Sequence, residues 1–392
     1  MTITPKQLEI EASYVQDAYM AMEDEIMKML VRQLNKPTKT PLTEDNAFRW
    51  KIEKMQQLNL LNQQSLQRIV QDTGNYTYGQ LKRIIVDMGF EVISDLDKSL
   101  SKQTGKEPPP RTEINNVMQS YFNQQWRDLD NHVNQTLIDT NYPNNPLAKM
   151  YQQVLNDTVA KIIGGAKTPQ QALRESIYAI VEKGVMTTFI DKAGREWSLE
   201  RYVRMVLKAT THRVYQDLRL KRGLEHGIVT ALMSSHVAAR PACAHIQGGW
   251  VLLVRTEDAP EELRHIPSIY NHGYGEPDGT QGINCRHRLY IQIYDPNLDV
   301  HMKQYDPKQA IDNADLVAKQ RRMEVAIRRA KRQLNAAITI DNKEDIQHFK
   351  QLIRRRQASL RAFINEHDQL LRRDYSREQV YEKIAHKLFV GN

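Results

Sequence analysis

Apolar side chains recur at spacings of three and four residues along much of the first 226 positions of this 392-residue chain. In the stretch 4–33, this pattern is formed by Val15, Tyr19, Met22, Ile26 and Met29. The spacing places these residues on one face of an α-helix, because a helix has 3.6 residues per turn. The chain is therefore predicted to be mostly helical, with helices that pack through one apolar face.

Prolines and glycines divide this helical signal into segments. Further helices are predicted over about 43–70, 78–100, 113–139, 146–163, 169–184 and 202–224. The helix over 43–70 is expected to bury Phe48, Ile52, Met55, Leu58 and Leu61, and to end at Gly74-Asn75. Thr168-Pro169 is a capping pair, and the segment 105–111 (GKEPPPR) is predicted to be an extended linker.

A change of pattern follows Gly227. The segments 228–233 and 250–255 are predicted to be β-strands, and the segment 289–294 (LYIQIY) alternates apolar and polar residues, which is typical of a β-strand. Between the last two lies a long segment, 258–282, that contains several glycines and prolines. A loop of this length in a compact domain is usually functional or fastened by other parts.

The last quarter of the chain is again helical. Leu316, Met323, Ala330 and Ala337 lie seven residues apart, as do Ile346, Ile353 and Leu360, with a turn at Asp341-Asn342 between the two series. This pattern predicts an antiparallel helical hairpin with a narrow seam. Ser376 with Gln379 matches a capping box, so a last short helix is expected there.

These patterns together predict a mostly α protein with a small α+β domain. Four regions are expected: N-terminal helices over 1–105, a second helical region over 106–226, a mixed unit with cysteines and histidines over 227–300, and a helical hairpin over 301–392. No stretch approaches the roughly 20 apolar residues that a membrane span needs, and the N-terminus does not resemble a secretory signal. We therefore expect a protein made in the cytoplasm.

The positive charge is concentrated in the hairpin. Residues 301–392 contain 20 Lys and Arg and 12 Asp and Glu, whereas the first 300 residues contain 35 of each. Such a block either contacts an acidic partner, of which nucleic acid is the obvious candidate, or is a solvated helix face. The candidate contact residues are Arg328, Arg329, Lys331, Arg332, Arg354, Arg355 and Arg356.

Both cysteines of the chain and eight of its 12 histidines lie between positions 212 and 301. Cys243 and His245 form one pair, and Cys285 and His287 form another. In an extended segment, residues i and i+2 point the same way, so the two pairs could supply four ligands to a tetrahedral zinc ion. His236 and His272 are further candidates. The alternative is that the cysteines are small buried apolar residues and the histidines bind loop backbone.

Few enzyme motifs are present: the chain has no GxxxxGK[ST] loop, GxSxG elbow or HExxH sequence. A zinc- or thiol-dependent hydrolase or nuclease that uses Cys243, His245, Cys285 and His287 remains as the alternative function.

The sequence resembles the phage minor capsid protein 2 family, which is similar in turn to the Mu F-type head morphogenesis proteins. The resemblance covers nearly the whole chain. Its motifs are 19–23, 48–58, Phe189–Trp197, Tyr202–Val206, Ser234-Ser235-His236, Arg240-Pro241, Gln247-Gly248, Asn284-Cys285-Arg286-His287 and 320–328. The resemblance identifies His236, Arg240, Pro241, Gln247, Gly248, Asn284 and Arg286 as residues of a structural motif.

Two positions depart from the family pattern. Cys243 stands where the family usually has His, and Ile246 stands where it usually has Trp. The Mu F-type proteins are similar to this chain at the first position, where they have cysteine. Exchange of His for Cys keeps a metal-binding side chain.

The resemblance implies a non-enzymatic protein of a tailed phage, present in few copies in the virion. It would be assembled in the cytoplasm of the bacterial host and bound to the portal protein inside the head. There it would act in assembly, DNA packaging or genome delivery, in contact with other head proteins and packaged DNA.

Overall fold

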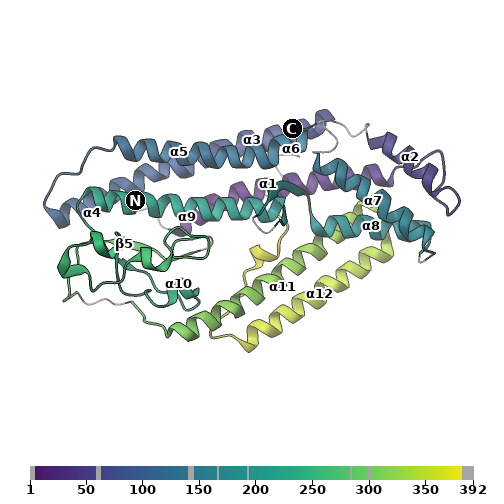
Figure 1. Cartoon of the computed structure of the whole chain (residues 1–392). Helices are drawn as coiled ribbons and strands as arrows, with labels where there is room; N and C mark the ends of the chain where they lie inside the picture. Colours follow the sequence, from purple (N-terminus) through teal and green to yellow (C-terminus); the bar gives the residue numbers. More distant parts are fainter. Residues whose placement is uncertain are drawn as a thin grey trace. The chain divides into compact units, whose positions relative to one another are not determined.

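The computed structural model describes residues 5–58, 63–139, 145–165, 167–191, 194–282, 285–298 and 302–381 (Figure 1). The α-helices are α1 (Pro5–Asn35), α2 (Ala47–Leu58), α3 (Gln63–Lys82), α4 (Met88–Thr104), α5 (Thr112–Leu129), α6 (Gln135–Ile138), α7 (Pro146–Ile163), α8 (Pro169–Lys183), α9 (Leu199–Glu225), α10 (Pro241–Ala244), α11 (Pro307–Ile340) and α12 (Lys343–Glu366). Two π-helical turns are η1 (Arg83–Asp87) and η2 (Asp130–Asn134). The 3-10 helices are η3 (Thr256–Asp258), η4 (Glu261–Leu263), η5 (Ile269–His272) and η6 (Tyr375–Glu378), and the strands are β1 (Met186–Ile190), β2 (Glu196–Ser198), β3 (Thr230–Met233), β4 (Trp250–Leu252) and β5 (Leu289–Ile291).

The chain forms two compact units. Unit 1 comprises Met1–Ser13, Tyr78–Trp126 and Met205–Lys319, and unit 2 comprises Tyr14–Thr77, Arg127–Arg204 and Gln320–Asn392. The predicted fold class, mostly α with a small α+β part, is confirmed. The four consecutive regions stay a prediction. No helix among the described residues has the length and apolar character needed to cross a membrane.

Unit 1 contains the small sheet. Strand β3 lies in the middle and pairs with β4 and β5, both antiparallel, so that Ala231 is opposite Val251 on one side and Ile291 on the other. The three predicted strands are therefore present, although each is shorter than expected. All four residues of β3 are buried, and Cys243 and Cys285 belong to the same apolar core as the sheet.

The predicted linker at 105–111 contains no helix or strand and is fastened to its neighbours. The guanidinium group of Arg222, which is fully buried, donates to the carbonyl oxygens of Pro109 (2.6 Å) and Pro110 (3.4 Å). The same group forms a salt bridge with Asp97 of α4, which is also bonded to Arg111. A buried charge is stable only when it is paired and hydrogen-bonded, and both conditions are met here.

Unit 2 contains α12 and the part of α11 from Gln320 on, which run side by side in opposite directions as the predicted hairpin (Figure 1). Asp341 adopts a positive φ of 60° at the turn, and the Asn342 side chain caps α12 by accepting from the Asp345 N–H. Of the predicted seam, Ala330, Ala337 and Leu360 are fully buried, whereas the other four residues are half-buried: Leu316, Met323, Ile346 and Ile353.

The predicted helix break at Gly74-Asn75 is wrong, because α3 continues through both residues to Lys82. A glycine inside a helix costs only about 1 kcal/mol relative to alanine. Burial of Val70, Thr73 and Thr77 compensates for this cost, and the Thr77 hydroxyl donates to the Thr73 carbonyl within the helix.

The predicted buried face of the second helix is also wrong. Phe48 and Ile52 are 63% and 61% exposed in α2, whereas Trp50 and Lys54 are buried. The apolar stem of Lys54 can be buried because its ammonium group donates to carbonyl oxygens of Gln33 and Lys36, at the C-terminal end of α1. A helix C-terminus attracts cations, which explains why a lysine occupies this face. Leu61 lies outside the described residues.

Two smaller corrections concern local elements. The last short helix, η6, is capped by Asp374, which accepts from the Ser376 N–H, and not by the predicted capping box. The antiparallel hairpin of β1 and β2 was not predicted, since its strands are short and their pairing is irregular.

Candidate functional site

Cys243 is placed by the short helix α10. Pro241 occupies the first turn of this helix, after Arg240 in an extended conformation, and the Cys243 side chain is fully buried. Arg240 donates to the carbonyl oxygens of Pro277 (3.1 Å) and Gly279 (3.3 Å). The Thr280 hydroxyl donates to the carbonyl oxygen of Ala242 (3.2 Å). The long loop is therefore fastened to the segment that carries the first cysteine.

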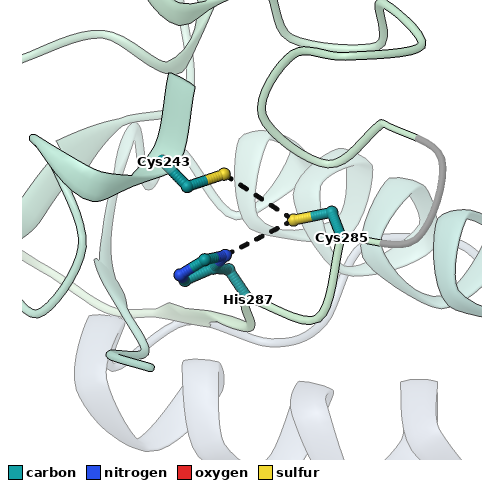
Figure 2. A group of neighbouring side chains, drawn as sticks. All are labelled: Cys243, Cys285 and His287. Atoms are coloured by element: carbon teal, nitrogen blue, oxygen red, sulfur yellow. Dashed lines mark hydrogen bonds between the residues drawn. The ribbon is translucent and has the colours of Figure 1, made fainter. Parts of the chain in front are cut away.

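Cys285 and His287 lie on an irregular segment just before β5. The Cys285 sulfur is 3.9 Å from the Cys243 sulfur and 3.5 Å from Nδ1 of His287 (Figure 2). All three side chains are buried, and their potential ligand atoms lie within 4.8 Å of one another. The prediction that the two cysteine segments converge is therefore confirmed for these three residues.

Gln247 fixes the orientation of His287. The Gln247 side-chain oxygen accepts from Nε2 of His287 (2.8 Å) and from the backbone N–H of His236 (2.9 Å). His236 packs edge-on against His287, with ring centres 4.6 Å apart. Its Nε2 lies 3.2 Å from the carbonyl oxygen of Arg286. Three motifs predicted from the sequence therefore meet here, at His236, Gln247 and His287.

The structure does not bring His245 into this group. The prediction assumed an extended segment, in which Cys243 and His245 would point the same way. Instead the chain turns helically here, so the two side chains diverge and His245 is exposed. His272 is likewise outside the group. Asn284 lies outside the described residues, and the side chain of Arg286 is exposed.

The electrostatic environment disfavours a reactive thiolate at Cys243. The hydrogen bond with Cys285 and burial raise the pKa of the Cys243 thiol well above its ordinary value. Burial, together with the neighbouring His287, lowers the pKa of His236. A thiol with a raised pKa is a poor nucleophile, so the metal-free site does not activate Cys243.

The basic residues predicted to contact an acidic partner fall into two sets. Arg328 and Arg332 are buried: Arg328 binds Glu200 (2.7 Å), and Arg332 binds both Glu200 (2.6 Å) and Glu23 (2.8 Å). The Arg356 guanidinium donates to the carbonyl oxygen of Ala326, and Lys331 is half-buried. The exposed members are Arg329, Arg354 and Arg355.

An exposed row of cations on α12 was missed by the sequence analysis. We define the cation row as Lys343, Lys350, Arg354 and Arg361. Their spacings of seven, four and seven residues place them on one line along the helix. This signal is visible in the sequence, but it is obscured by the neighbouring run Arg354–Arg356, whose members point in different directions.

The comparison with known proteins agrees with the expected resemblance. The profile of the phage minor capsid protein 2 family matches residues 3–365, so the chain belongs to this family. It is 35% identical to a structural protein of Lactococcus phage LL-H over 368 residues, which are 93% of this chain and 98% of that protein. It is 38% identical to a structural protein of Lactococcus phage mv4 over 114 residues, 29% of this chain and 91% of that protein. No solved structure matches the chain.

Proposed function

We propose that this phage minor capsid protein acts at the portal vertex, inside the head, in head assembly, DNA packaging or genome delivery. The observation that carries the proposal is the family match over residues 3–365, supported by a relative of nearly equal length named as a structural protein. The partners would be the portal protein and other head proteins. The raised pKa of the Cys243 thiol argues against Cys243 as the nucleophile in the alternative of a thiol-dependent hydrolase.

The cation row is the proposed contact with packaged DNA. From Lys343 to Arg361 it extends for about 27 Å, at a rise of about 1.5 Å per residue. This length allows the row to follow several phosphates of one strand. The nearby carboxylate of Asp345 is already paired with Arg174 (2.9 Å), so it does not cancel the charge of the row. The exposed Arg329 and Arg355 could add to this contact.

The position in the particle is tested by an asymmetric cryo-EM reconstruction of virions, together with quantitative mass spectrometry of the purified particles. We expect density for the chain at one vertex only and a copy number far below that of the major capsid protein. A copy number comparable to the major capsid protein, or absence from both heads and virions, would refute the proposal.

The DNA contact is tested by replacing the four residues of the cation row with glutamine. A matched control replaces the exposed Arg32, Lys39, Lys149 and Lys183 of unit 2, which removes the same charge elsewhere. Each lost phosphate contact lowers the slope of log K against log salt by about 0.9 on duplex DNA. The cation-row variant should bind duplex DNA at least about tenfold more weakly, with a slope smaller by roughly 2–4. If both variants lost the same DNA affinity, binding would depend on total charge alone, and the cation row would not be a specific DNA contact.

A further inference from the structure

Two of the three distances in the cysteine cluster match those of a tetrahedral zinc centre, and the third, between the Cys243 sulfur and the His287 ring, is within 4.8 Å. With Zn–S bonds of about 2.3 Å and Zn–N bonds of about 2.0–2.1 Å, two thiolates lie about 3.8 Å apart, and a thiolate and an imidazole nitrogen about 3.6 Å apart. The corresponding distances here are 3.9 Å between the two sulfurs and 3.5 Å between the Cys285 sulfur and Nδ1 of His287. An ion could therefore enter with little movement of the ligands.

The hydrogen bonds also determine which nitrogen of His287 is free. A backbone N–H can only donate, so the Gln247 atom that meets the His236 N–H must be the oxygen. The same oxygen is 2.8 Å from Nε2 of His287, which must then carry the proton. In the neutral ring, Nδ1 consequently has the lone pair, and this nitrogen faces the sulfur of Cys285 (Figure 2). Histidines that bind metal ions are oriented by such a bond from their other nitrogen.

We propose that Cys243, Cys285 and His287 bind a zinc ion that stabilises unit 1. Two thiolates and one imidazole form a donor set that zinc prefers over magnesium or calcium. Among the described residues, no further Cys, His, Asp or Glu belongs to the group, which leaves one position of the tetrahedron for a further ligand. The ion joins α10 to the segment before β5 and thereby fastens the loop between them. This role does not depend on the proposed position in the virion.

The test uses the full-length wild-type protein, purified without chelator and analysed for metal. We expect about one zinc ion per chain. Since the chain has only two cysteines, an organomercurial reagent should release the zinc in parallel with the modification of both thiols. Cobalt substituted for zinc should give the absorption bands of a tetrahedral site with sulfur ligands. These measurements need no variant, so a folding defect cannot produce a false result.

Variants assign the ligands. His287→Ala should lose zinc, and the thermal unfolding temperature of the wild-type protein should fall when zinc is removed by a chelator. His245→Ala is the matched control, because this exposed histidine is also two residues from a cysteine but outside the group; it should keep the zinc. The proposal is refuted if zinc-supplemented wild-type protein contains no metal, if the two cysteines form a disulfide instead, or if His245→Ala loses zinc as fully as His287→Ala.

Discussion

The sulfur atoms of Cys243 and Cys285 lie 3.9 Å apart, although 42 positions separate the two residues in the sequence. In its described part, up to residue 282, the segment between them contains short elements only: β4 and the 3-10 helices η3, η4 and η5. Both cysteines belong to the buried core of unit 1, so core packing holds this segment in place. The side chain of Gln247 accepts hydrogen bonds from His287 and from the backbone of His236, and so holds His287 next to the two cysteines.

We predict that Gln247→Ala destabilises the protein by about 1–3 kcal/mol, because the buried Nε2 of His287 and the N–H of His236 would lose their acceptor. Urea unfolding of the purified chain measures this change. The control is Gln119→Ala, at an exposed position on α5, where a change within about 0.5 kcal/mol is expected. Equal effects of the two substitutions would contradict the role given to Gln247.

A larger loss is expected for Arg222→Met, since this substitution leaves the buried carboxylate of Asp97 without its main partner. Removal of one member of a buried ion pair costs about 3–5 kcal/mol. The carbonyl oxygens of Pro109 and Pro110 would lose their donor as well. Urea unfolding again gives the free energy.

The neighbouring Lys221 provides the control for Arg222. Its salt bridge with Glu113 (2.8 Å) is at the surface, where such pairs contribute about 0–1 kcal/mol. Lys221→Met should therefore change stability little. A cost for Arg222→Met below about 1 kcal/mol would show that the linker is not fastened by this residue.

Features of the fold that depend on neighbouring residues were predictable. Thr168 and Gln171 form the capping box at the start of α8, and Gly184 ends that helix, because both signals act within a few residues. The α11–α12 hairpin followed from its heptad spacing in the same way. The break at Gly74 was not correct, since a small local cost was outweighed by tertiary burial.

The candidate site was only partly predictable for a related reason. Cys285 and His287 converge as the i, i+2 rule for extended segments requires, whereas His245 diverges because one helical turn, α10, precedes it. Pairings between distant positions leave no local signal. The bond from Arg332 to Glu23 joins residues 309 positions apart, and nothing near Arg332 in the sequence marks it as buried.

The buried charges of unit 2 make its stability dependent on pH. Burial opposes ionisation of Glu200, but the guanidinium groups of Arg332, Arg328 and Arg204 outweigh it and lower its pKa to about 2. The pKa of a glutamate in an unfolded chain is about 4.3. Glu200 therefore contributes stability above that pH, and this contribution is lost as the pH falls towards 2.

The whole contribution of Glu200 is about 3 kcal/mol, of which about 2 kcal/mol should be lost between pH 6 and pH 3, measured by urea unfolding. Glu200→Gln should be less stable than the wild-type protein at neutral pH and should show a smaller decrease over this range. Glu196→Gln, at an exposed position of β2, should keep the wild-type pH dependence. Parallel curves for wild-type and Glu200→Gln proteins would contradict the assignment.

Gly184, at the end of α8, lies close to the buried ion pair of Glu23 and Arg332. Its φ is 82°, and a Cβ atom there would lie 2.7 Å from Oε1 of Glu23 and 2.9 Å from Nη1 of Arg332. Because Gly184 has a ψ of 176°, a combination almost restricted to glycine, Gly184→Ala should cost about 1–3 kcal/mol of backbone strain and also disturb a buried salt bridge, for a total of about 3 kcal/mol or more. Gly165→Ala is the control for a positive φ without a contact, because Gly165 has a φ of 65° and no heavy atom within 4 Å of the added Cβ. It should cost only about 1 kcal/mol. If urea unfolding gave equal losses for both substitutions, backbone strain alone would account for Gly184, and the close approach of Glu23 and Arg332 would have no energetic weight.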